Sequence, residues 1–288
     1  MASVGDDAAV LRQPGGDFQV ISTDHLRSLI DDPALMTRIA AVHALGDIWA
    51  MGAQPQVGLA SIVMPQMSAD LQKRTLLEIT QVASEVLSAA GAQLVGGHTT
   101  MGAELTIGFT VTGTRDMMPL MVTGAKAGDV LILTRPIGSG IILAADMAAQ
   151  VNGRYVAAAL KIMSQAQDRE AAVLGPIAHA MTDVTGFGLA GHVQAICETS
   201  ELDAHLWQNT IPTYDGARAL SKAGFSSTLT PTNRLDAPVM GIEDALLHDP
   251  QTAGGLLAAV PEGQSLAIIK ALNSKGCIGH IIGKLTKG

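Results

Sequence analysis

Carboxylates that could bind a hard cation recur along this chain. They lie in five short stretches beside apolar runs, most of them rich in Gly or Thr: Asp6-Asp7, Asp24, Asp47, Asp183 and Asp249. A rigid element beside such a stretch can hold a carboxylate in place. Oxygen ligands, without cysteines or clustered histidines, favour magnesium or calcium over zinc. The sequence therefore predicts a site for a hard divalent cation.

The segment 38–55 predicts a buried helix that carries the acid Asp47. Apolar side chains cover nearly its whole circumference, so we expect protein on all sides. Gly52 fits the position after the helix end, and Pro55 prevents its continuation. A buried carboxylate must be paired, hydrogen-bonded or bound to a cation. Alone, Asp47 fits a capping or Arg-pairing role as well as a metal site; the other acidic stretches favour the metal.

The turn predicted at Gly96-Gly97-His98 could bind phosphate. Ala92–Val95 should be a strand that enters this turn. Two adjacent glycines allow backbone N–H groups to approach an anion closely, as in phosphate-binding nests. Gly-Gly is also common in ordinary turns, in which case His98 is simply a loop residue. The pair alone leaves both interpretations open.

Two further polar segments could contribute to a site. Asp183 precedes Gly186 and Gly188, which should open an apolar helix, so its carboxylate should project at a helix N-terminus. The structural alternative makes Asp183 a helix cap and His192 a partly exposed helical residue. The glycine spacing does not match a dinucleotide-binding fingerprint. Arg234 should lie in a polar turn at 230–234, as a solvated charge or as a phosphate contact.

Cysteine chemistry has little support in this sequence. Cys197 and Cys277 are the two cysteines, too few for a disulfide framework or a Cys-based zinc site. Cys197 lies in a helical pattern and Cys277 precedes a predicted apolar strand at 278–282. We therefore expect both to be small buried apolar residues and not nucleophiles.

Composition restricts the class of protein. Hydrophobic residues make up 48% of the 288 residues and aromatic residues only 3%, which favours closely packed layers of helices and strands. A net charge of −8 without a Lys/Arg-rich run argues against nucleic-acid binding and against anionic membrane surfaces. No apolar run reaches the about 20 residues of a membrane span. We expect a cytoplasmic protein. Because its net charge is negative, a polyanionic substrate would have to be neutralised by a bound metal.

Hydrophobic periodicity predicts an α/β (α+β) protein, either of two domains or of one large domain, and favours two. We place the boundary between domains 1–115 and 116–288. The first should contain a hairpin of 3–10 with 18–22, strands 57–63 and 105–112, and a helix at 69–90 capped by Ser68. The second should open with strand 129–134, followed by helices from 140, at 156–163 and at 169–180, strand 203–207, a helix within 211–224, and a helix and a strand within 265–283.

Several motifs resemble those of the selenophosphate synthetase (selenide, water dikinase) family. The matching stretches, in family order, are 5–10, 22–24, 44–55, 96–98, 181–192 and 249–257. The first three also occur across the wider superfamily of aminoimidazole ribonucleotide synthetase, thiamine-monophosphate kinase and the hydrogenase maturation dehydratase. The last two indicate selenophosphate synthetase specifically.

This resemblance implies a two-domain aminoimidazole ribonucleotide synthetase-like fold. Its N-terminal sheet would form a β-barrel across a homodimer, and a C-terminal α/β domain would follow, with ATP between the domains. The implied reaction converts ATP, selenide and water into selenophosphate, AMP and phosphate. Magnesium and ATP are the implied cofactor and substrate.

The resemblance also implies site residues. Magnesium ligands would be Asp7, Asp47 and Asp183. ATP-binding residues would be Val4, Gly5, Asp6, Asp24, Asp47, Gly96, Gly97 and His98. Further contacts could come from His43, Arg234 and Asp249. His43 stands one turn before Asp47, where the family often has Asn, and could add a hydrogen bond or change the metal shell.

The sequence departs from the family at its start. The family has a Gly-rich loop with a reactive Cys or selenocysteine, and a Lys, upstream of the segment 5–10; Met1–Val4 leaves no room for either. The sequence could be N-terminally truncated, part of a longer fused polypeptide, or a natural variant. Selenium could be supplied by a fused or separate delivery protein. The alternatives to selenophosphate synthesis are a Mg-ATP-binding regulatory homologue and another small-molecule kinase.

Overall fold

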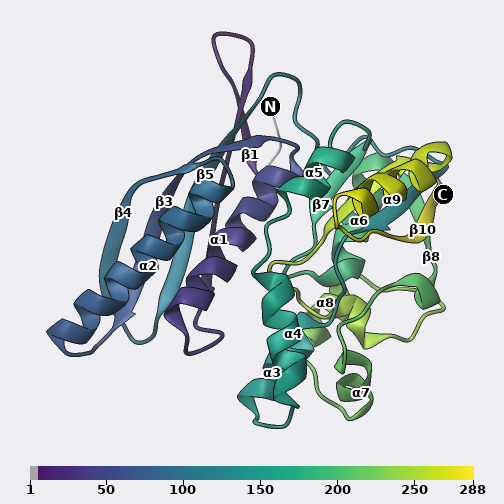
Figure 1. The fold of residues 1–288 in the computed structure, drawn as a ribbon. Coiled ribbons are helices and arrows are strands. Elements are labelled where there is room, and N and C mark those ends of the chain that lie inside the picture. The colour runs from purple at the N-terminus through teal and green to yellow at the C-terminus, as the bar shows by residue number, and fades with distance from the viewer. Residues whose placement is uncertain (1–5) are drawn as a thin grey trace. The chain divides into compact units, whose positions relative to one another are not determined.

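A computed structural model describes residues 6–288 and divides them into two compact units. The first unit extends to Pro119 and includes Ser164–Asp168, and the second comprises Leu120–Met163 and Arg169–Gly288. Each unit contains one five-stranded sheet with helices packed on it (Figure 1). The fold is thus mixed α/β. Within the described residues, no helix is both long and apolar enough to cross a membrane.

The sheet of the first unit has the strand order β1-β2-β5-β3-β4. Only β3 and β4 pair in parallel; the other neighbours are antiparallel. The predicted hairpin is confirmed, with Val10 opposite Val20. The strands are β1 (Ala9–Arg12), β2 (Phe18–Arg27), β3 (Gln54–Pro65), β4 (Gln93–Gly102) and β5 (Thr106–Arg115).

Two helices cover one face of this sheet, α1 (Pro33–Ala50) and α2 (Ala69–Ala89) (Figure 1). Asp32 caps α1 by accepting a hydrogen bond from the N–H of Leu35, and Ser68 caps α2 as predicted. Gly52 follows α1 with a φ of 64°, which favours glycine. The predicted buried helix is confirmed, because α1 is enclosed along most of its length. Among the described residues of this unit, no helix packs on the opposite face, which exposes Leu59.

The turn expected at residues 96–100 is wrong, because the strand β4 continues through both glycines. A Cβ atom added to Gly97 would lie 2.0 Å from the carbonyl oxygen of Ala60 on β3. The glycine therefore lets two parallel strands approach closely. No local pattern distinguishes this long-range requirement from a turn.

The second sheet is antiparallel throughout, with the order β7-β9-β6-β10-β8. Its central strands are almost entirely buried, which explains their continuous apolar sequences. The strands are β6 (Asp129–Leu133), β7 (Ala180–Asp183), β8 (Leu202–Leu206), β9 (Leu256–Pro261) and β10 (His280–Lys287). The helices are α3 (Ser139–Met147), α4 (Gly153–Met163), α5 (Asp168–Leu174), α6 (Gly188–Ser200), α7 (Ala217–Lys222), α8 (Thr230–Asp236) and α9 (Ser265–Ser274), with 3₁₀ turns at Gln208–Thr210, Ala245–His248 and Glu262–Gln264.

Three element predictions in this unit need correction. The polar turn expected at 230–234 is the helix α8, which Pro231 helps to begin and in which Asn233 donates to the carbonyl of His248. The helix expected at 169–180 ends at Leu174, where Gly175 and a proline stop it. The last strand begins at His280, two residues later than predicted.

Candidate metal and nucleotide site

Asp47 lies on the enclosed helix α1, and its side chain is held by the neighbouring strand β2. Only 9% of the residue is exposed. The hydroxyl of Ser22 on β2 donates a short hydrogen bond to Oδ2 of Asp47 and lies 3.4 Å from the carbonyl oxygen of Asp7. The hydroxyl thus fixes the orientation of the Asp47 carboxylate and links it to the chain segment that carries Asp7.

Asp7 and Asp47 come together in the first unit. One carboxylate oxygen of each lies within 4.8 Å of the other. Two oxygens bound to one magnesium or calcium ion at about 2.0–2.6 Å can be no more than about 5 Å apart, so this pair can share a cation. Two carboxylates this close also repel each other unless a positive charge lies between them.

Asp24 and His43 lie beside this pair. Asp24 follows Ser22 on β2 at the spacing of one sheet face, and His43 precedes Asp47 by one helical turn. Loss of hydration lowers the pKa of His43, and the charge of Asp24 opposes this shift. The imidazole is therefore neutral at neutral pH and adds no positive charge. Asp6 accepts a hydrogen bond of 3.1 Å from the N–H of Asp7.

The donors in this unit fit a hard cation. Carboxylate and hydroxyl oxygens surround the Asp7–Asp47 pair, and the nearby histidine is uncharged. This chemistry matches magnesium better than a transition metal, which would select thiolates or several imidazoles. The predicted ATP-binding residues Val4 and Gly5 lie outside the described residues.

Gly96, Gly97 and His98 line a separate pocket of about 350 Å³. Side chains of β3 and α2, including Ile62 and Thr80, form its other walls. Asp7, Asp24 and Asp47 are not among its lining residues. Gly97 packs closely against β3. A phosphate contact of Gly96, Gly97 and His98 stays a prediction.

In the second unit, Asp183 is the last residue of β7 and is only 2% exposed. The following N–H, of Val184, donates to the carbonyl of Gly255 at 2.9 Å. The guanidinium of Arg135 is also buried; burial lowers its pKa, and Tyr214, Glu170 and Asp183 act against that shift by charge attraction. Asp183 is therefore a buried carboxylate at a strand end, not a helix cap.

The helix after Asp183 also contradicts the alternative in which Asp183 only caps the helix and His192 is partly exposed. α6 begins at Gly188, and its N-cap residue Phe187 makes no side-chain cap. His192 is buried, not partly exposed, and its Nε2 accepts the N–H of Thr185 at 3.0 Å. Burial lowers the pKa of His192 to about 4, so the ring is a neutral acceptor that shapes the turn after β7.

Asp249 and Arg234 lie elsewhere in the second unit. Asp249 is buried, and its Oδ2 accepts from the N–H of Gly140 and the amide of Gln251, each at 3.0 Å. Burial raises the pKa of Asp249 to about 7, although these hydrogen bonds and that of Ile141 act in the opposite direction. Arg234 is exposed on α8 and lines a pocket of about 550 Å³.

Sequence reasoning missed the roles of Ser22, Arg135 and Gln251. Gln251 accepts through Oε1 from the N–H groups of Gly138 and Ser139, and so holds the start of α3. Each of these contacts joins residues far apart in the sequence. The one available signal was composition: a lone Arg or Gln inside an otherwise apolar or Gly-rich run requires buried partners.

Comparison with known proteins identifies the family. The AIR synthase related protein N-terminal domain matches residues 5–115 and the corresponding C-terminal domain matches residues 126–288. The selenide, water dikinase of Bdellovibrio bacteriovorus is 35% identical over 97% of this chain and 83% of its own length. The chain belongs to the selenide, water dikinase family. This is a family of phosphotransferase enzymes, as the resemblance of the motifs implied.

Solved structures of other proteins share the fold of this chain. Thiamine-monophosphate kinase from Stenotrophomonas maltophilia K279a has a TM-score of 0.76 and 20% identity, covering 100% of this chain and 89% of that one. The hydrogenase maturation protein HypE, solved in complex with ATP, has a TM-score of 0.70 and 18% identity, covering 93% and 77%. At these identities the similarity is one of fold.

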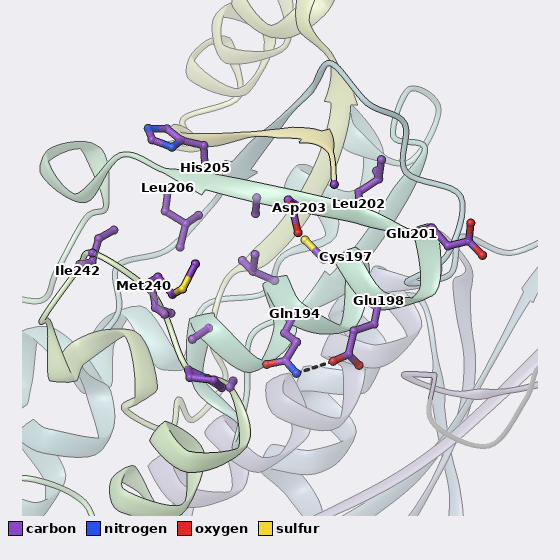
Figure 2. A pocket seen from close by; sticks show the side chains of 18 residues that line it. Gln194, Cys197, Glu198, Glu201, Leu202, Asp203, His205, Leu206, Met240 and Ile242 are labelled. Atoms are coloured by element: carbon purple, nitrogen blue, oxygen red, sulfur yellow. Dashed lines mark hydrogen bonds between the residues drawn. The ribbon is translucent and has the colours of Figure 1, made fainter.

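Neither cysteine of this dikinase-family chain has the surroundings of a nucleophile. Cys197 lines a pocket of about 820 Å³ formed by α6, β8 and residues 237–242, with Glu198 and Asp203 nearby (Figure 2). Burial first, and then Asp203 and Glu198, raise the pKa of this thiol to about 11. Cys197 is partly exposed, in contrast to the expectation, whereas Cys277 is buried as expected. A protonated thiol is a poor nucleophile.

Proposed function

We propose that this chain makes selenophosphate from selenide with Mg-ATP, releasing AMP and phosphate. The observation that carries the proposal is the carboxylate pair Asp7–Asp47 in a chain whose dikinase relatives match it along nearly its whole length. A protein with a net charge of −8 repels a triphosphate, so it requires a bound cation at such a site.

Asp7 and Asp47 are the magnesium ligands in this proposal, and Asp183 of the second unit is the third. Bound magnesium neutralises phosphate charge and polarises phosphoryl oxygens. Ser22 keeps the Asp47 carboxylate in its ligating orientation. The neutral His43 contributes a polar group without competing for the anionic ligands. The buried position of Asp183 at the end of β7 supports its role, because a rigid strand end holds the carboxylate in place.

The proposed nucleotide contacts come from two stretches, residues 4–24 and residues 96–98. Asp6 and Asp24 contact the nucleotide–metal unit, and Gly96, Gly97 and His98 line the phosphates, together with Val4 and Gly5. Phosphoryl transfer depends mainly on positioning and charge neutralisation, so no side chain needs to attack phosphorus. Arg234 and Asp249, which like Asp183 belong to the second unit, are additional contacts in this proposal.

The test is selenide-dependent AMP formation from Mg-ATP, with nucleotide binding measured in parallel. AMP that appears only when selenide is present supports the proposal. Asp183→Asn should abolish this activity while near-native circular dichroism shows that the chain still folds. Full activity of Asp183→Asn would remove Asp183 from the metal site without affecting the Asp7–Asp47 pair.

A second function is favoured by the cysteine chemistry: a Mg-ATP-binding homologue that makes no selenophosphate. The thiol of Cys197, with its pKa of about 11, is unsuited to carry selenide. In this case magnesium-dependent nucleotide binding would persist and no AMP would form. If AMP formed once a separate selenium-delivery protein was added, the assignment would return to selenophosphate synthesis.

A further inference from the structure

Three polar side chains of the second unit that have no role in the site described above form a connected row. Nδ1 of His179 lies 3.0 Å and 2.9 Å from the two carboxylate oxygens of Asp129. Nε2 of the same ring lies 3.1 Å from Nζ of Lys126. The side chain of Asp129 is 4% exposed and that of His179 is 25% exposed, while Lys126 is on the surface.

The backbone fixes all three positions. Lys126 and Asp129 close a tight turn, in which the N–H of Asp129 donates to the carbonyl of Lys126 at 2.9 Å, and the N–H of Lys126 donates to Oδ2 of Asp129 at 2.8 Å. Asp129 begins the buried strand β6. The N–H of His179 donates to the carbonyl of Ala259 on β9 at 2.9 Å. The row is therefore held by the second sheet and its turn.

The hydrogen bonds define the roles of the two ring nitrogens. The Asp129 carboxylate accepts, so Nδ1 of His179 carries the proton and Nε2 presents its lone pair to the amine of Lys126. A buried acid that orients an imidazole, whose other nitrogen faces a nucleophile, is the arrangement that activates nucleophiles in covalent catalysis. Here the nucleophile is an amine.

We propose that Lys126 is an activated lysine that accepts an acyl group from an acyl phosphate or an acyl thioester. One proton of the Lys126 ammonium passes to Nε2 of His179, and the freed lone pair forms a C–N bond to the acyl carbon. The C–O bond of the acyl phosphate, or the C–S bond of the thioester, breaks with its electron pair on the leaving group. A second proton then leaves the nitrogen for the leaving group or water, which yields a neutral amide.

A purely structural role makes a different prediction. In that role the row would only hold the turn before β6, in which Asp129 accepts the N–H of Lys126. In that case Lys126 would be no more reactive than other surface lysines of the chain. Site-specific reaction rates distinguish the two roles, because stability measurements would not reveal an activated amine.

The experiment incubates the full chain with acetyl phosphate and, separately, with acetyl coenzyme A, and follows acetylation of each lysine by mass spectrometry. The exposed Lys222, Lys270 and Lys275 are internal references. General-base assistance predicts that Lys126 reacts at least about tenfold faster than the references. Faster reaction in only one arm identifies the acyl donor class. Equal rates at all four lysines in both arms would overturn the proposal without any variant.

Variants then test the relay itself. His179→Gln should lower the Lys126 rate to that of the reference lysines, and Asp129→Asn should lower it partly. His205→Gln, at an exposed histidine on β8, is the matched control and should leave the rate unchanged. If Lys126 keeps its advantage in a folded His179→Gln protein, the imidazole is not the base and the proposal fails.

Discussion

A single hydroxyl connects the Asp47 carboxylate to the backbone of Asp7. Ser22 donates to Asp47 and lies next to the carbonyl of Asp7, so it fixes an acid that the apolar surface of α1 could not orient. Groups that hold a metal ligand from outside typically contribute 10- to 100-fold in metal affinity. The Ser22 hydroxyl can therefore affect metal affinity as much as a weak ligand does.

Ser22→Ala should weaken magnesium-dependent nucleotide binding by about 10- to 100-fold, because the Asp47 carboxylate loses its fixed orientation. Ser22→Thr, which keeps a hydroxyl, should recover most of the affinity. Isothermal titration calorimetry at several magnesium concentrations measures the effect. Wild-type affinity in Ser22→Ala would show that Asp47 is oriented by other contacts or binds no metal.

Asp249 makes stability depend on pH. Its pKa is raised to about 7 in the folded chain, mainly by burial, against an ordinary value of 3.8. Between these values the folded state binds one proton more than the unfolded state, so this group lowers the free energy of unfolding by about 1.4 kcal/mol per pH unit as pH rises. The loss stops above about pH 7, where both states are ionised.

Asp249→Asn should remove this dependence while its amide oxygen still accepts from the N–H of Gly140. The variant should gain stability relative to wild type as pH rises from 4 to 7, with a constant difference above that. Urea unfolding at several pH values measures it. A flat difference for Asp249→Asn would mean that Asp249 is ionised in the folded chain at low pH.

At the scale of elements, glycines set the distance between strands and loops. A Cβ atom on Gly254 would lie 1.9 Å from the carbonyl oxygen of Val184, the residue after Asp183. The loop before β9 is therefore in close contact with the backbone that follows β7. A backbone carbonyl cannot move aside as the end of a flexible side chain can. The position of Asp183 depends on this contact.

Gly254→Ala should lower the free energy of unfolding by about 1–3 kcal/mol, the usual cost of overpacking. It should also reduce AMP formation, because Val184 and the neighbouring Asp183 must shift. Gly263→Ala is the matched control, since nothing lies within 4 Å of its Cβ position. Thermal unfolding and the AMP assay are the measurements. Normal stability of Gly254→Ala would show that the loop can move away at little cost.

Elements that bury a regular apolar face could be predicted from the sequence, and elements defined by distant contacts could not. The helix around Asp47 was predictable because its apolar residues surround it and Gly52 ends it. The strand through Gly96 and Gly97 was not, because the small size of Gly97 serves Ala60, more than 30 residues earlier in the chain. The same holds for Ser22 and Asp47, which meet only after β2 packs on α1.

At the scale of the whole molecule, one face of the first sheet has no covering element in the part of its own unit that the structure describes. Leu59 on β3 is 44% exposed, and it stands in one cross-strand row with Thr110 and Thr23. The edge strand β4 adds the exposed Val95. Exposed apolar surface on a sheet, next to an open edge strand, requires a cover. We propose that a second copy of the chain supplies it, as a cytoplasmic homodimer with a shared β-barrel.

Leu59→Asp should weaken this dimer. Each leucine buried at an interface contributes about 1.5 kcal/mol or more, and the two copies together about 3 kcal/mol, so the dissociation constant should rise about 100-fold or more. Leu235→Asp, at an 82% exposed leucine on α8, is the matched control and should leave the dimer intact. Sedimentation equilibrium at micromolar concentration measures both. A wild-type chain that remains monomeric there would contradict the proposal, and the exposed face would then need a different partner.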